Sequence, residues 1–143
     1  MEKLVTDITC LPYGGKLLYL SSIQDLYNGE IISYTLSNKQ NVLDTLNQLP
    51  DLTSSCLLHG DQGSVYTSCL YQETIKRKGI TMSMSRKGTP ADNAPIESFH
   101  ASLKSEIFYL DCLTCSTNAI VEQAVRDYIE YYKKLLIQAK LKY

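Results

Sequence analysis

A single aspartate interrupts the first apolar run of the chain. Residues 3–11 are rich in β-branched and apolar side chains, which predicts a β-strand, and Asp7 stands in the middle of that strand. A buried carboxylate without a partner is costly, so an acid at this point is unusual. The position of Asp7 therefore needs a physical reason, which the rest of the sequence has to supply.

The following segments predict an antiparallel meander. Residues 17–23 and 30–36 are further runs of the strand type. A glycine pair at 14–15 separates the first two strands, and Asn28-Gly29, a strong hairpin signal, separates the second from the third. We therefore expect three consecutive antiparallel strands at the start of the fold.

Beyond the meander, helical and strand patterns alternate, which is typical of an α/β protein. We predict helices at about 39–49, 66–78 and 121–135, and strands at 54–58 and 80–84. The length of 143 residues suits one domain with its own core.

Another helix begins near residue 92, because Asp92 or Asn93 can cap it and a proline follows in its first turn. Its apolar face is formed by Ile96, Phe99, Leu103 and Ile107. Glu97 and Lys104 lie seven residues apart, so they return to nearly the same azimuth, about 100° from that face. Such a row can hold a metal and contact an anion. The alternative is an ordinary solvated helix face.

A third acid follows the strand predicted at 54–58. The run His59-Gly60-Asp61-Gln62-Gly63 lies just past its carboxyl end, where open α/β sheets place their sites. Three gathered carboxylates would repel one another as bare anions, but they suit hard divalent cations, which prefer oxygen ligands. Two such ions can activate a water or hydroxyl and stabilise the leaving oxygen of a phosphodiester.

His59 and His100 are further possible ligands or bases, although a structural role is favoured for both.

Charge and cysteine content narrow the class of protein. Residues 1–75 carry three lysines against eight acids, whereas residues 76–143 carry eleven basic residues against seven acids, so the second half could meet phosphates. The five cysteines are irregularly spaced, which fits reduced thiols better than a disulfide framework. No run is long and apolar enough to cross a membrane, and no signal-peptide pattern is present. We therefore expect a cytoplasmic protein.

Taken together, these motifs resemble the catalytic core of bacterial insertion-sequence transposases related to retroviral integrases, of the type encoded in a second, overlapping reading frame. The resembling blocks cover nearly the whole chain in the family's order, at 6–9, 19–21, 25–27, 59–68, 83–90, 92–99, 103–106 and 128–132. The resemblance implies an RNase H-like fold, in which a five-stranded mixed sheet, made of the antiparallel meander and parallel strands, is flanked by helices.

The resemblance also implies a chemistry. Asp7, Asp61 and Glu97 would be a catalytic acidic triad that binds two Mg²⁺ ions, for which Mn²⁺ can substitute. The enzyme would cut DNA at the element's end and then join the freed 3′ hydroxyl to a second phosphodiester. Lys104 would contact DNA near the active site. Arg86, Lys87 and Asn93 fall at family-typical positions for DNA contact, with surface solvation or helix capping as the open alternative.

The implied partners are DNA (element ends and target), further copies of the chain assembled on DNA, and a helix-turn-helix protein from the first reading frame. The implied location is the bacterial cytoplasm, at the nucleoid. We expect residues 1–143 to form one catalytic domain, without the N-terminal DNA-binding region or the extreme C-terminal tail of the family.

The sequence departs from the family at several positions. Gly60 stands for a usual serine and Leu4 for an aromatic residue, while Lys133 and Leu136 replace an asparagine and an arginine. The missing arginine removes a fork-shaped phosphate ligand. The alternative function is therefore a truncated, non-catalytic remnant that keeps the fold and binds DNA or a full-length transposase. A general RNase H-like nuclease is a second alternative, but the blocks at 83–90 and 92–99 resemble transposases in detail.

Overall fold

The computed structural model describes most of the chain. The described residues are 2–13, 16–27, 29–39, 42–49, 56–60, 69–84, 94–110 and 118–141. Their elements, in chain order, are β1 (Glu2–Tyr13), β2 (Lys16–Asp25), β3 (Ile31–Ser37), α1 (Val42–Asn47), β4 (Cys56–Gly60), α2 (Cys69–Arg77), β5 (Ile80–Met84), α3 (Ala94–Leu110) and α4 (Asn118–Leu141).

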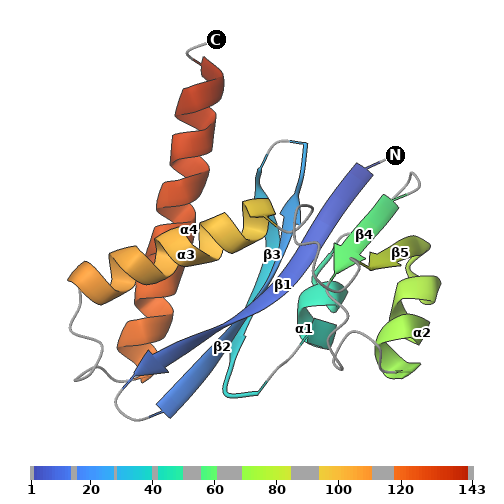
Figure 1. Ribbon diagram of the computed structural model, residues 1–143, viewed down its shortest axis with the longest axis horizontal. Coiled ribbons are helices and arrows are strands. Elements are labelled where there is room, and N and C mark those ends of the chain that lie inside the picture. Colours follow the sequence, from blue (N-terminus) through green and yellow to red (C-terminus); the bar gives the residue numbers. More distant parts are fainter. Residues whose placement is uncertain are drawn as a thin grey trace.

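Within the described residues, five strands form one mixed sheet in the order β3-β2-β1-β4-β5 (Figure 1). Strands β1, β2 and β3 pair antiparallel, whereas β4 pairs parallel to both β1 and β5. The meander and the parallel strands expected from the sequence are therefore confirmed, and so is the RNase H-like arrangement of a mixed sheet flanked by helices.

The sheet separates two apolar clusters. On one face, α1 and α2 cover a cluster formed by Leu4, Ile23, Leu46, Leu49, Cys56, Leu58, Tyr71, Ile75 and Ile80. On the other face, α3 and α4 cover a cluster formed by Leu11, Leu18, Leu20, Ile31, Phe99, Leu103, Val121, Val125 and Ile129. Because side chains alternate along a strand, β1 contributes Leu4 to the first cluster and Leu11 to the second.

The turn between β2 and β3 is held by α4. Gly29 has φ of 77°, a left-handed conformation that glycine adopts without strain, as the Asn28-Gly29 signal predicts. Its carbonyl oxygen accepts hydrogen bonds from Gln24 Nε2 at 3.0 Å and from the Tyr132 hydroxyl at 3.1 Å. The hairpin is therefore anchored to a helix more than a hundred residues away in the sequence.

Several predicted boundaries were wrong. The strand expected to end at residue 58 continues to Gly60, because pairing with β1 and β5 extends as far as His59 and Gly60. The predicted start at residue 54 lies outside the described residues. Helix α4 continues to Leu141 instead of ending near residue 135, because no glycine or proline stops it and Leu136 reaches the Gly29 turn. The β1–β2 hairpin is also longer than predicted, with pairing up to Tyr13 and Lys16.

The described residues bear on two expectations from the sequence, one about membrane-spanning segments and one about the cysteines. Among the described helices, none is both long and apolar enough to cross a membrane. Cys10, Cys56 and Cys69 are free thiols, which agrees with the expectation of reduced cysteines for these three.

The two leucines Leu103 and Leu70 offer a matched test of the core. Leu103 on α3 is fully buried, whereas Leu70 on α2 is 58% exposed. Leu103→Ala should lower the free energy of unfolding by about 3 kcal/mol, because it leaves a cavity under α3. Leu70→Ala should change that free energy by less than about 0.5 kcal/mol. Urea denaturation measures both values, and equal losses would contradict this placement of α3.

A buried tyrosine predicts how stability depends on pH. Burial raises the pKa of the Tyr71 hydroxyl above its usual value of 10.0. The stability that Tyr71 contributes is thus fully present below the unfolded-state pKa and is lost as pH rises above it. Each such group lowers the free energy of unfolding by up to about 1.4 kcal/mol per pH unit in that alkaline range.

Tyr71→Phe should therefore flatten the alkaline loss of stability, as measured by urea denaturation at a series of pH values. Tyr27→Phe is the control, because Tyr27 is 95% exposed and its phenol keeps water in both states. An identical alkaline slope in Tyr71→Phe and in the unchanged protein would contradict the prediction.

Candidate active site

The candidate site starts at Asp7, on the face of the sheet that α3 covers. Asp7 lies four residues before Leu11, so the alternation along β1 directs both side chains to the same face. Its cross-strand partner on β2 is Ser22. The Asp7 side chain is 21% exposed, so its carboxylate keeps contact with water. The predicted placement of an acid in the middle of a strand is therefore confirmed.

Helix α3 is fixed against the sheet by an apolar row. Ile96, Phe99 and Leu103 are buried at helical spacing, as the sequence predicts. The Phe99 ring packs against the Tyr132 ring of α4, with 4.7 Å between the ring centroids. Burial raises the pKa of Tyr132, and the hydrogen bond from Gln24 partly offsets this effect, so Tyr132 keeps its proton at neutral pH. These contacts determine which side of α3 meets β1 and β2.

His100 is the residue through which α3 reaches the two strands. Its side chain is buried, with Nε2 at 3.0 Å from Ser22 Oγ and Nδ1 at 3.7 Å from Asp7 Oδ2. The imidazole therefore lies over the cross-strand pair of Asp7 and Ser22. The sequence marked His100 as a possible ligand or base but gave no indication of this contact.

Two further predicted residues flank His100 on the same side of α3. Glu97 lies one turn before it and Lys104 lies one turn after it, so the three follow one another along the helix. Glu97 is exposed and Lys104 is half-buried. A carboxylate and an ammonium group are thus available to solvent on either side of the Asp7–His100 contact.

The remaining predicted site residues fall outside the described part of the chain. These are Asp61, Arg86, Lys87 and Asn93. Strand β4 ends at Gly60, immediately before Asp61. Among the described residues, no group of three or more His, Cys, Asp and Glu side chains gathers closely enough to hold a metal ion. The metal-binding triad therefore stays a prediction.

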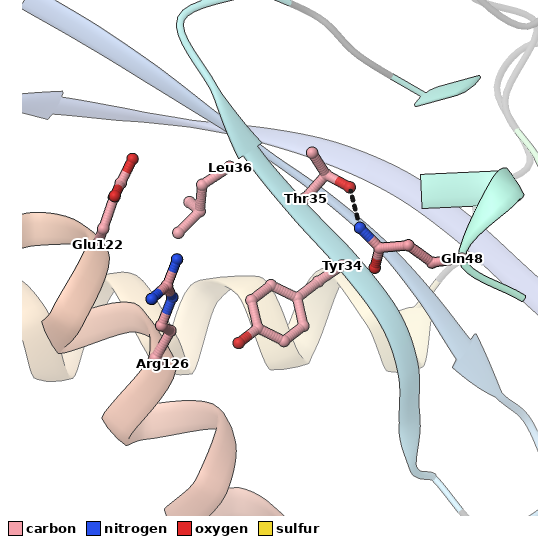
Figure 2. Close-up of a pocket in the computed structure, with 6 residues that line it drawn as sticks. All are labelled: Tyr34, Thr35, Leu36, Gln48, Glu122 and Arg126. Atoms are coloured by element: carbon pink, nitrogen blue, oxygen red, sulfur yellow. Dashed lines mark hydrogen bonds between the residues drawn. The ribbon is translucent and has the colours of Figure 1, made fainter. Parts of the chain in front are cut away.

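A separate hollow lies at the edge of the sheet. Its volume is about 430 Å³, and it is lined by Tyr34, Thr35, Leu36, Gln48, Glu122 and Arg126. Figure 2 shows Glu122 and Arg126 of α4 beside strand β3, and Gln48 donating a hydrogen bond to Thr35 on the other side. None of these residues belongs to the candidate active site.

Comparison with solved structures concerns the fold. The fold resembles the HTLV-2 integrase catalytic core domain, solved in complex with magnesium in a trimeric form, with a TM-score of 0.64 at 17% sequence identity. The match covers 89% of this chain and 81% of that one. The architecture is therefore that of a retroviral integrase core.

Sequence comparison then identifies the family. Profiles of the family described as integrase core domain match residues 1–90 and 97–138, so the chain belongs to this family. It is 44% identical to the putative transposase InsK for insertion sequence element IS150 of Escherichia coli (strain K12), over 99% of this chain and 51% of that protein. It is 38% identical to an uncharacterized transposase-like protein of Haemophilus influenzae, over 99% of this chain and 67% of that protein. The expected insertion-sequence transposase core is confirmed, and the chain spans about half the length of the InsK relative.

Proposed function

We propose that this chain is the catalytic core of a DNA transposase, which cuts DNA strands and transfers them with the help of divalent metal ions held by Asp7, Asp61 and Glu97. The observation that carries this proposal is the contact of α3 with β1. Because His100 meets Asp7 and Glu97 precedes His100 by one turn, the two carboxylates belong to the same side of the sheet.

The register of the parallel strands supports the third member of the triad. Val5 of β1 pairs with His59 of β4. Asp7 lies two residues beyond Val5, and Asp61 lies two residues beyond His59. The two acids thus have matching positions in the sequence relative to the last residue pair of β1 with β4. Asp61 itself lies outside the described residues.

The described residues of the proposed site fit hard cations such as Mg²⁺. Asp7 and Glu97 both offer carboxylate oxygens with access to solvent, and such oxygens are the preferred ligands of Mg²⁺. We propose two Mg²⁺ ions, with Mn²⁺ as a substitute. When bound, the ions would supply a more acidic water or hydroxyl and would neutralise charge on the leaving oxygen.

The residues of the chain itself would perform the remaining tasks. Asp7, Asp61 and Glu97 would hold the ions. Lys104 is half-buried and lies on the side of α3 that carries Glu97 and His100. Its ammonium group would therefore bind the DNA backbone beside the ions. Arg86, Lys87 and Asn93 are proposed as further DNA contacts on the resemblance of their sequence blocks alone.

The proposed reaction has two steps. In the first, water attacks a phosphodiester at the element's end and releases a 3′ hydroxyl group. In the second, that hydroxyl attacks a phosphodiester of the target DNA and displaces its 3′ oxygen. This second step forms one phosphodiester bond and breaks one.

The proposed partners are those of an insertion-sequence transposase. They are DNA, further copies of this chain on DNA, and a helix-turn-helix protein of the first reading frame. Cytoplasmic location and a single catalytic domain over residues 1–143 remain predictions.

One observation favours the alternative of a non-catalytic remnant. Leu136 stands where the family usually has arginine, and its Cδ2 lies 3.6 Å from the position that a Cβ on Gly29 would take. Leu136 thus packs against the β2–β3 turn and offers no group for a phosphate. A remnant of this kind would keep the fold without turnover, which the next experiment decides.

Glu97→Gln should abolish Mn²⁺-dependent nicking of supercoiled DNA, with a loss of at least about a hundredfold, because a neutral amide is a poor ligand for a hard cation. The melting temperature should stay unchanged or rise, because Glu97 is exposed and repulsion between acids is relieved. Glu106→Gln is the matched control, since Glu106 is an exposed acid on the opposite side of α3. Undiminished nicking by a folded Glu97→Gln protein would refute the ligand role, and no nicking by the unchanged chain would favour the remnant.

Lys104→Ala should weaken DNA binding to a similar extent for all sequences, because a phosphate contact carries no base information. The slope of log K against log salt concentration should become shallower by about one unit. Lys76→Ala is the control, because Lys76 is exposed on α2, which covers the other face of the sheet. Fluorescence anisotropy at several salt concentrations measures the slope, and an unaltered slope would show that Lys104 does not bind phosphate.

A further inference from the structure

His100 is a buried residue of the candidate site, and the proposed acidic triad gives it no function. The His100 ring of α3 lies against the cross-strand pair formed by Asp7 of β1 and Ser22 of β2. Its Nδ1 atom is buried and has no hydrogen-bond partner among the described residues, and the nearby oxygen is Asp7 Oδ2 at 3.7 Å. A buried polar nitrogen that points at a carboxylate without bonding to it calls for an explanation.

The hydrogen-bonding capacity of the ring supplies one. A neutral imidazole has one N–H donor and one acceptor nitrogen. A serine hydroxyl can serve as donor, so Ser22 can donate to Nε2 across the observed 3.0 Å. The hydrogen then resides on Nδ1, which faces Asp7. A small rotation of the Asp7 carboxylate would bring Oδ2 to the usual N–H···O distance of about 3 Å.

This arrangement would matter for a metal ligand. An aspartate carboxylate rotates about its last torsion with little preference, so an unrestrained one presents its oxygens in many directions. A hydrogen bond to Oδ2 would hold that oxygen and leave Oδ1 turned toward a cation. Groups that orient ligands in this way commonly change metal affinity by 10–100-fold when removed.

We propose that His100 is a positioning residue: its Nδ1–H donates to Asp7 Oδ2, anchored from behind by Ser22, and so orients the Asp7 carboxylate for a divalent cation. This inference rests on the proposed function, because it takes Asp7 as a metal ligand. The same contact would set the separation of Asp7 from Glu97, since Glu97 is one turn away on the same helix.

Two substitutions separate this role from others. The Nδ2 amide of an asparagine takes the place of the imidazole Nδ1, whereas the Nε2 amide of a longer glutamine takes the place of the imidazole Nε2. His100→Asn therefore keeps a donor toward Asp7 and loses the contact with Ser22. His100→Gln keeps a group near Ser22 and loses the donor toward Asp7. Neither amide nitrogen can replace an imidazole as a metal ligand.

The experiment is a Mn²⁺ titration of the full chain by calorimetry, with the melting temperature of each variant measured in parallel. We expect His100→Gln to bind Mn²⁺ about tenfold more weakly than the unchanged chain, and His100→Asn to bind within about threefold of it. Both variants should melt below the unchanged protein, because each loses part of the ring packing, so melting alone does not produce this difference.

Every other pattern would overturn the inference. Equal losses in both variants would show that the ring itself is needed, as a ligand or as packing. A greater loss in His100→Asn would assign the role to the Ser22 side, and no loss in either would leave His100 without a role in metal binding.

The Asp7→Asn variant tests the proposed metal site separately from the positioning role of His100. If the unchanged chain binds no Mn²⁺, or if Asp7→Asn binds Mn²⁺ as well as the unchanged chain does, the proposed metal site fails and the inference fails with it. If Asp7→Asn abolishes binding but the His100 variants lack the expected difference, only the positioning role of His100 fails.

Discussion

The packing of α3 across β1 and β2 is the interaction on which the candidate site depends. Phe99 and Leu103 bury the apolar side of the helix, and the Phe99 ring meets Tyr132 of α4. Once that side is fixed, the helical repeat determines the direction in which Glu97, His100 and Lys104 face. The core therefore does more than stabilise the fold, because its packing sets the rotation of the helix that bears the chemical groups.

The central strand shows how a fold can keep an acid in an otherwise apolar segment. Pairing between β1 and β4 ends at Val5 and His59, so Asp7 lies beyond the part of β1 that is flanked on both sides by described strands. Its side chain remains 21% exposed, and its carboxylate lies 3.7 Å from Nδ1 of the His100 ring. Partial hydration and one polar neighbour reduce the desolvation penalty that makes mid-strand acids unusual.

Much of the fold could be predicted from the sequence, because the meander, the Gly29 turn and the buried side of α3 are local patterns. The β4 boundary could not, because a buried glycine such as Gly60 joins a strand through its neighbours and not through its own propensity. The extension of α4 also depends on a distant turn, which Tyr132 and Leu136 contact. The pairing of His100 with Asp7 is of the same kind, since it requires both the β1–β2 register and the rotation of α3.

The anchoring of the Gly29 turn by Tyr132 has a consequence for the order of folding. These two residues are separated by 103 positions, so their contact closes a very long loop. The entropy lost in closing such a loop is repaid only when other long-range contacts already exist. The β2–β3 hairpin can therefore form early from local signals, but it receives its last support after α4 has been synthesised and has docked. During synthesis on the ribosome, strands β1, β2 and β3 would therefore pair while the face that α4 later covers is still exposed.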